Sequence, residues 1–545
     1  MSLTSYRTPS FRSLVALLAA ALLVFPLFAT PAFPQQGPGS VDLITADQLR
    51  DYLFFIASDE MEGRRAPSRG LDLTAKFIAL ELSRWGAKPA GDDGGYLQMI
   101  ELERSTVDAA ASFFEVDGMR FGFGDGFLSG STPGSGSARL LYAGDGWVVP
   151  QQGADPYQGL DVRGAVVVVT GATPAEMTRE QMGAEGVQRP AQYLADHGAL
   201  AMIVAPNART LQRWERSVQM AGQRGATRVV GLDGGGGSRL LQLTASTSLI
   251  EALFAGTETD AAGVLAATEG DDPGVSFDLG KTVDFEIAVT TETLTTQNVV
   301  AIFEGTDPEL KDEYVAIGAH YDHMGVGNPV DGDGIYNGAD DDGSGTTAVL
   351  AIAEALAKGE RPKRSVMLVW HTGEEAGMWG SRYINEKLPV PARNIVAALN
   401  IDMIGRSRPA GDTNPANANL TGPNEVYVIG PGVQSAAMGE ILDQVNDNYL
   451  GLTFNPMYDA MDHPERIFFR SDHINYARNG IPIAFFFTGT HEDYHRPSDH
   501  PDKIDYDKML NITRTIYAIA WDLASRPDRP ALNADLPEEL RGGGR

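Results

Sequence analysis

Hydrophobic positions along the second half of the chain fall into short runs that alternate with amphipathic stretches. The runs are rich in Val, Ile and Phe, which is typical of buried strands. Thr346–Lys358 and the segment around Met509–Leu523 instead carry apolar residues every three or four positions, which predicts helices that bury one face. The predicted strands are Gln297–Phe303, Tyr314–Ile317, Ser365–Trp370, Ile395–Ile401 and Ile481–Phe487.

The first half carries two further helical patterns, Thr45–Ser58 and Asp72–Trp85, and then changes in texture. From about residue 138, short β-branched runs are separated by Gly and Pro. Val166–Val169 and Ala201–Val204 are predicted strands, with a helix over Arg189–His197 between them. We therefore predict an α/β domain built on a mixed, mostly parallel, doubly wound sheet, interrupted by an inserted β-rich domain.

These patterns divide the chain into segments. Residues 41–137 and 286–525 form the two parts of the α/β domain, and residues 138–285 form the insertion, which includes a flexible loop at Gly234–Gly237. Residues 526–545 are rich in Pro, Gly and charge, which predicts a disordered tail.

Residues 1–36 have the pattern of a secretory signal. Arg7 and Arg12 precede the apolar run Leu14–Phe28, and small residues lead to a cleavage site near Ala32. The run is short for a membrane span, so we expect export to the periplasm or the extracellular space and no stable span after cleavage; an uncleaved anchor remains the alternative.

Charge and cysteine content narrow the function. The chain has 43 Lys and Arg against 72 Asp and Glu, a net charge of −29, which disfavours nucleic acid as a partner. It has no cysteine, so a bound metal must be held by His, Asp and Glu.

Side chains of these types stand where the predicted strands end. They are His320 and Asp322, Glu374 and Glu375, Asp402, and the histidines of the loop Thr488–His500. Parallel strands place such positions at one edge of the sheet. A carboxylate two residues after a histidine can orient its ring, and of two adjacent glutamates one can bind a metal while the other acts as a base.

An acidic run, Asp340–Asp342, lies between a Gly-rich loop and the helix that begins near Thr346. Three adjacent carboxylates repel one another, and a divalent cation would relieve that repulsion. A calcium loop of the EF-hand type does not fit, because the twelfth position counted from Asp340 is Ala351, where a bidentate Glu is required.

A competing metal motif occurs at His491–His495, which formally matches the one-zinc protease pattern with Glu492 as base. That mechanism needs both histidines on one helix face. Gly489 and Pro497 flank the motif, and Pro497 disfavours helical geometry at Arg496. We therefore treat it as the less favoured alternative.

Six motifs carry a resemblance to a known family. HYD, GADDDGSG, HTGEEAGMWGS, NIDMIG, RSDH and DYHRPSD occur in the order found in the co-catalytic di-zinc aminopeptidase family of clan MH. That family includes secreted bacterial aminopeptidases, glutamate carboxypeptidase and the transferrin receptor. The inserted segment, with Tyr157–Gly164 and His197–Ala199, resembles a protease-associated domain.

The resemblance implies a site that holds two zinc ions per chain. Asp341 would bridge them, with His320 and Asp402 on one ion and Glu375 and His495 on the other. Glu374 would be the general base, Asp322 would orient His320, and Tyr494 would hydrogen-bond the oxyanion. Asp342 stands where many relatives have Asn, so the pattern leaves a choice between neighbouring acids for the bridging residue. The distance in sequence from Gly343–Gly345 favours Asp341.

The implied function is a zinc exopeptidase that removes N-terminal residues from peptides with a free N-terminus. Two alternatives on the same fold stay open: a carboxypeptidase or glutaminyl cyclase, and a receptor-like binding protein without activity. His323, His463 and His197 are interpreted as structural or surface residues, and His371 and His473 as near the site without a role.

Overall fold

The computed structural model describes residues 37–174, 177–218, 225–232, 240–270, 272 and 274–541. The predicted signal segment 1–36 and the Gly234–Gly237 loop lie outside these residues. Within the described ranges, no helix has the length and apolar character that a membrane crossing requires.

The main sheet has ten strands in the order β19-β18-β20-β17-β13-β16-β12-β2-β9, with β1 paired to β12. Strands β13, β16, β17 and β20 run parallel, whereas β12 and β18 join them antiparallel, so the predicted mixed sheet is confirmed. It is not mostly parallel as predicted, because five of the nine strand pairings among its described residues are antiparallel. The bounds are β1 Lys88–Pro89, β2 Leu97–Val107, β9 Ala226–Val229, β12 Val289–Phe303, β13 Tyr314–His320, β16 Ser365–His371, β17 Ile395–Ile401, β18 Glu425–Ile429, β19 Thr453–Asn455 and β20 Ile483–Phe487.

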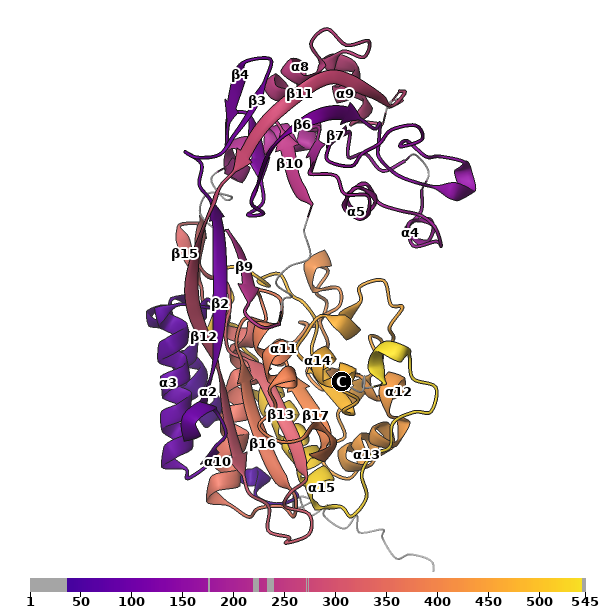
Figure 1. Ribbon diagram of the computed structural model, residues 1–545. Coiled ribbons are helices and arrows are strands. Elements are labelled where there is room, and N and C mark those ends of the chain that lie inside the picture. Colours follow the sequence, from indigo (N-terminus) through magenta and orange to yellow (C-terminus); the bar gives the residue numbers. More distant parts are fainter. Residues whose placement is uncertain are drawn as a thin grey trace, which may run out of the picture.

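Helices cover both faces of this sheet (Figure 1). One face packs against α2, α3, α10, α13 and α15, and the other against α11 and α14. Helix α10 is buried more deeply than its one-sided pattern predicts, because every residue from Gly345 to Ala353 is buried. The bounds are α2 Ala46–Ile56, α3 Arg69–Arg84, α10 Gly345–Lys358, α11 Trp379–Glu386, α12 Pro431–Gln434, α13 Ala436–Asp447, α14 His473–Arg478 and α15 Tyr506–Ser525.

A second sheet of eight strands, in the order β4-β3-β11-β6-β7-β8-β10-β5, has its own apolar core. In Figure 1 it stands at one end of the main sheet, and the long strands β2 and β12 lead to it. The bounds are β3 Phe113–Val116, β4 Met119–Gly122, β5 Phe127–Ser129, β6 Gly134–Tyr142, β7 Val166–Val169, α4 Arg179–Met182, α5 Pro190–Asp196, β8 Ala201–Val204, α6 Ala208–Gln212, β10 Leu241–Ala245, α8 Thr247–Phe254, α9 Ala261–Ala267 and β11 Phe277–Ile287.

The start predicted for the insertion, residue 138, falls inside β6. Strands β3, β4 and β5 precede that residue and belong to the eight-stranded sheet, because Phe114 of β3 stacks on Phe285 of β11 with ring centroids 5.3 Å apart. We therefore propose that the inserted unit runs from about residue 108 to residue 288, between the paired residues Val107 and Val289.

The tail differs from its predicted disorder over residues 526–541. Leu536 and Leu540 are buried, and Leu532 packs against the same apolar cluster as α11 and α14. The Ser435 hydroxyl donates to the carbonyl of Ala531. Three leucines spaced by four residues anchor a segment whose overall composition is polar.

Candidate metal centre and active site

The predicted site residues lie at one edge of the main sheet. His320 is the last residue of β13, Glu374 and Glu375 follow β16, Asp402 follows β17, and the loop with His495 follows β20. Since these four strands are parallel, their carboxyl ends bring the side chains together. Asp341 reaches the same place from the turn that leads into α10.

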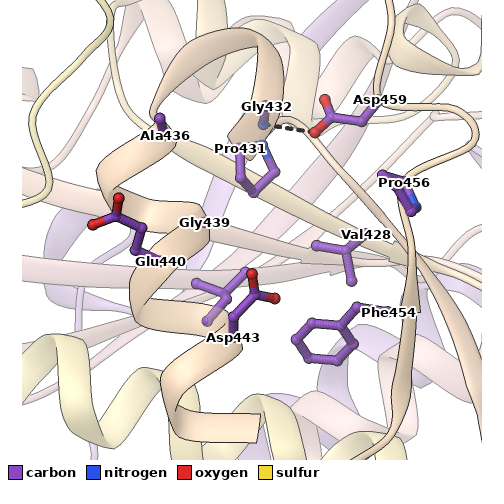
Figure 2. Close-up of a pocket in the computed structure, with 11 residues that line it drawn as sticks. Val428, Pro431, Gly432, Ala436, Gly439, Glu440, Asp443, Phe454, Pro456 and Asp459 are labelled. Atoms are coloured by element: carbon purple, nitrogen blue, oxygen red, sulfur yellow. Dashed lines mark hydrogen bonds between the residues drawn. The ribbon is translucent and has the colours of Figure 1, made fainter. Parts of the chain in front are cut away.

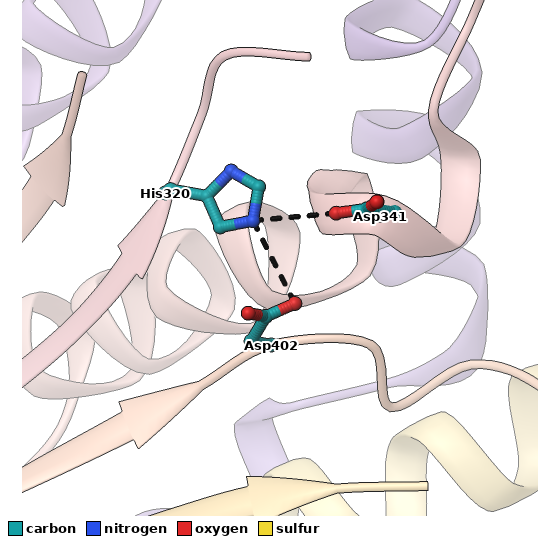
Figure 3. A group of neighbouring side chains, drawn as sticks. All are labelled: His320, Asp341 and Asp402. Carbon is teal, nitrogen blue, oxygen red and sulfur yellow. Dashed lines mark ion pairs between the residues drawn. The ribbon is translucent and has the colours of Figure 1, made fainter. Parts of the chain in front are cut away.

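One cluster joins His320, Asp341 and Asp402 (Figure 3). The Nε2 atom of His320 lies 3.3 Å from Asp341 Oδ1 and 3.6 Å from Asp402 Oδ1. All three residues are buried, and His320 Nε2 has no hydrogen-bond partner among the described residues. Burial disfavours protonation of His320, but Asp402 and Asp341 outweigh it and raise its pKa well above the usual range.

A second cluster uses the other oxygen of Asp341. His495 Nε2 lies 3.1 Å from Asp341 Oδ2 and 3.2 Å from Glu375 Oε2. Burial lowers the pKa of His495, but hydrogen bonding to Asp341 and Glu375 outweighs it and raises the value to about 10. Asp341 therefore faces both clusters, one with each oxygen.

The two neighbours of Asp341 are engaged elsewhere. Asp340 Oδ1 accepts the N–H of Gly405 at 2.6 Å, and Asp342 Oδ1 accepts the N–H of Gly345 at 2.8 Å. Burial and the charge of Asp402 raise the pKa of Asp342 well above its usual range. Of the three adjacent aspartates, Asp341 is the one placed to be shared.

His323 lies at the second cluster, whereas its sequence context predicts only a structural or surface role. It is buried, and its Nδ1 lies 2.8 Å from Glu375 Oε1 and 3.7 Å from Asp341 Oδ2. Neither ring nitrogen has a hydrogen-bond partner among the described residues. His323 stands three residues after His320 in a loop, where no periodic pattern marks it.

The donor set fits divalent cations. Each cluster offers imidazole nitrogen and carboxylate oxygen, the ligands that zinc accepts in proteins without cysteine. His320 Nε2 faces Asp341 Oδ1 at 3.3 Å and His323 Nδ1 faces Glu375 Oε1 at 2.8 Å, and neither nitrogen has hydrogen-bond geometry to a described residue. Such buried and unpaired donor atoms fit ligation of a shared ion. The shared carboxylate allows two such ions side by side.

Glu374 and Tyr494 line a small pocket, about 40 Å³, beside these clusters. Its other lining residues are Asp341, Asp402, Met403, Ile467, Arg470, Phe485, Phe487, Thr490 and His495. Burial, together with the charges of Asp472 and Asp402, raises the pKa of Glu374 well above its usual range. Burial and the charges of Asp341 and Glu375 also raise the pKa of Tyr494, so its hydroxyl keeps its proton.

Asp322 contacts both His320 and Glu374. Its backbone carbonyl lies 3.1 Å from His320 Nδ1, whereas its carboxylate is 3.8 Å from that atom. The carboxylate accepts the N–H of Glu374 at 3.1 Å. The ring of His320 is therefore held by the backbone carbonyl of Asp322, and the carboxylate of Asp322 holds the backbone of Glu374.

The competing motif is not arranged as a one-zinc site. His491 Nε2 lies 3.3 Å from Asp340 Oδ2, and residues 491–495 form turns and no helix. Glu492 is exposed and accepts a hydrogen bond from Asn414 Nδ2 at 2.7 Å. His491 and His495 thus face different aspartates.

Two residues outside the predicted set hold the loops of the site. Arg64, fully buried, donates to the carbonyls of Tyr321 and Gly338, each at 2.9 Å. Asp499 Oδ2 accepts the N–H groups of Asp340 and Asp341 at 2.9 and 3.2 Å. A polar turn such as Glu62–Arg65 carries no sequence signal for a buried arginine.

Residues 298–520 match the model of peptidase family M28. The match places the similarity to this peptidase family in the part of the chain that carries the two clusters. The chain is similar to a probable leucine aminopeptidase of Arthroderma benhamiae, 27% identical over 227 residues that cover 40% of this chain and 56% of that protein. Leucine aminopeptidase 1 of Ajellomyces capsulatus is 27% identical over 231 residues, 40% of this chain and 55% of that protein.

The chain spans a little over half the length of these curated relatives. Among solved structures, the aminopeptidase from Aneurinibacillus sp. strain AM-1 covers 91% of this chain and 98% of its own, with a TM-score of 0.52 and 17% identity. At that identity the likeness shows a shared fold. The M28 match itself ends before the tail and leaves out the inserted sheet.

Proposed function

We propose that this protein is an exported, zinc-dependent aminopeptidase that uses two metal ions and Glu374 as general base. The observation that carries the proposal is Asp341, which offers one oxygen to His320 and Asp402 and the other to His495 and Glu375. The M28 match and the names of the aminopeptidase relatives support the same reaction class.

Each ion would be held by residues already in contact. His320, Asp341 and Asp402 would hold one ion. Asp341, Glu375 and His495 would hold the other, and His323, which groups with Asp341 and Glu375, would be a further ligand to it. When bound, the two ions would supply an acidified water and polarise the carbonyl of the peptide bond.

Glu374 has the position and the pKa of a proton carrier. It lines the pocket next to both clusters, it is not needed for either ligand set, and its raised pKa favours taking up a proton near neutral pH. It would accept a proton from the attacking water and deliver it to the leaving amine. Asp322 accepts the backbone N–H of Glu374, which would hold the Glu374 carboxylate in a fixed direction.

Tyr494 and the pocket walls would select the substrate. The protonated hydroxyl of Tyr494 can donate a hydrogen bond to the developing oxyanion. A positively charged α-amine is favoured by the surplus of carboxylates, Asp341, Glu374 and Asp402. Ile467, Phe485 and Phe487 line the same pocket, which favours an apolar side chain on the N-terminal residue.

The test combines metal analysis with a matched set of substrates. We expect the purified chain to carry two zinc ions, to lose activity with a chelator and to hydrolyse leucine amide but not N-acetyl-leucine amide. Faster release from the carboxyl end of a blocked peptide would make it a carboxypeptidase, and cyclisation of N-terminal glutamine would make it a glutaminyl cyclase. A protein with neither zinc nor turnover would be a binding protein.

A further inference from the structure

A partly apolar hollow lies away from the metal clusters, between α13, the edge strand β19 and its neighbour β18. We call it the α13 slot. It has a volume of about 370 Å³ and is lined by Val428, Pro431, Gly432, Ala436, Gly439, Glu440, Leu442, Asp443, Phe454, Pro456 and Asp459. Pockets of this size hold a small ligand or a long side chain.

Topology separates the slot from the catalytic edge. Strand β18 is antiparallel to β20: Ile429, at its carboxyl end, pairs with Phe485 in the middle of β20, and Gln434 of the following helix α12 accepts the N–H of Ile483, the first residue of β20, at 3.2 Å. Pro431 and Gly432 continue from there. The metal clusters lie beyond the other end of β20, and no residue lines both the slot and the site pocket.

The lining combines an apolar wall with negative charge. Figure 2 shows the carboxylate of Asp443 turned towards Phe454 and Val428 across the slot, whereas Glu440 points away from it. Asp459 closes the far end and is already engaged, because its oxygens accept the N–H groups of Gly430 and Gly432 at 2.8 and 2.6 Å. No Lys or Arg lines the slot.

Of the two carboxylates of α13 that line the slot, Asp443 is therefore the one that points into it. Asp443 is exposed at the mouth of the slot, and its partial desolvation together with the neighbouring charge of Asp447 raises its pKa. Phe454 presents an aromatic ring beside it, and Pro431, Val428 and Pro456 supply apolar surface. An occupant that satisfies all three features needs an apolar stem, a planar cation and a length that spans the slot.

We propose that the α13 slot is a second binding site, which takes the side chain of an arginine presented by a peptide. The alkyl stem would lie on Val428 and Pro431, and the guanidinium would stack on Phe454 and pair with Asp443. Arginine is favoured over lysine, because a planar guanidinium can stack on a ring and bind a carboxylate with two N–H groups at once.

The probe for this site is Nα-acetyl-arginine N-methylamide, whose blocked amine disfavours binding in the catalytic pocket. Binding to the zinc-loaded protein is measured by saturation-transfer NMR, against the citrulline and norleucine analogues, which are similar in shape but neutral. We expect the arginine compound to bind about tenfold more tightly than either analogue, the change typical of one charge-assisted hydrogen bond.

Three variants localise the binding. Asp443→Asn should weaken it about tenfold, whereas Asp447→Asn, a change of the same kind on the same helix but outside the slot lining, should have a much smaller effect. Gly439→Leu should block the slot without altering charge, because a Cβ at Gly439 already lies 3.5 Å from Pro431 Cβ. Gly439→Ala is its matched control and fits at ordinary contact distance.

Equal binding of the arginine and citrulline compounds, or undiminished binding by both Asp443→Asn and Gly439→Leu, would overturn the proposal. Loss of leucine amide hydrolysis is not part of the test. The binding site and the proposed activity can therefore fail independently.

Discussion

Glu374 and Glu375 are adjacent in the sequence and have different surroundings. Glu375 is within 3.2 Å of both His323 and His495, whereas Glu374 lines the pocket without entering either cluster. We expect Glu374→Gln to keep two zinc ions and to lower kcat by ~10²–10⁴, the usual contribution of a general base. Glu375→Gln should instead lose zinc. Elemental analysis and initial rates on leucine amide separate the two effects.

Glu492 is the control for the alternative mechanism. Its carboxylate is exposed and bound by Asn414, so Glu492→Gln should retain near-normal zinc content and rate. If Glu492→Gln abolished turnover while Glu374→Gln remained active, the one-zinc reading of His491–His495 would replace the two-metal assignment.

His323 tests how many side chains hold the second ion. If it is a ligand, His323→Ala should weaken one of two zinc sites by roughly 10–100-fold, a typical loss when metal-site support is removed. His491→Ala is the matched control, because His491 is equally buried but faces Asp340, outside both clusters. Titration of the apo-protein with zinc gives both affinities. Two unchanged affinities in His323→Ala would reduce this residue to a packing role.

At the scale of elements, the short helix α14 begins with a buried histidine that is held neutral. His473 Nε2 lies 2.9 Å from the carbonyl of Phe468, its ring stacks on Phe485, and Nδ1 has no partner among the described residues. Protonation would leave a buried charge with one N–H unpaired. Burial accordingly lowers the pKa of His473 to about 4.

This arrangement predicts that the free energy of unfolding decreases as the pH falls. Because the pKa is lower in the folded than in the unfolded chain, the unfolded state takes up a proton first as the pH falls below about 6.5, and stability is lost down to about pH 4. Between pH 7 and pH 5 the loss should be roughly 2 kcal/mol. In His473→Gln, urea titrations should show a correspondingly smaller decrease. An equal decrease in both proteins would assign the acid sensitivity to other groups.

Elements with strong periodicity were predictable, and those that depend on distant partners were not. The strands β16 and β17 and the helices α10 and α15 follow from continuous apolar runs or one-sided faces. Strand β2 is half exposed along its length and is fixed by eleven paired residues of β12, which no local pattern reveals.

The same contrast holds for the site. His320, Glu375 and Asp402 could be predicted as metal ligands. Each is a His, Asp or Glu that stands where an apolar run ends, and this pattern is visible in the sequence. Arg64 is different: it lies in the N-terminal part of the chain and its acceptors are backbone carbonyls near residues 321 and 338. Backbone acceptors carry no residue identity, so such contacts appear only in the fold.

At the scale of the whole molecule, the position of the inserted sheet determines how it can affect the entry of substrates. In Figure 1 it stands at one end of the main sheet. Strands β14 (Gly325–Val330) and β15 (Asp333–Tyr336) pair with each other in the segment that joins His323 to Asp340. The residues that line the site pocket all lie between 341 and 495. The insertion can therefore limit the approach of large substrates without forming the pocket itself.

Deletion of the insertion tests this directly, since Val107 and Val289 are paired across antiparallel strands and can be joined by a two-residue Asn-Gly turn. We expect the shortened protein to hydrolyse leucine amide at the original rate and to gain activity on long polypeptides, because only the approach to the pocket changes. The deletion also removes β9 and with it the ion pair of Arg228 with Glu103, so a full-length Arg228→Ala variant is the control for that lost contact. An unchanged ratio of the rates for long and short substrates, with leucine amide hydrolysis intact, would show that the insertion does not screen substrates by size.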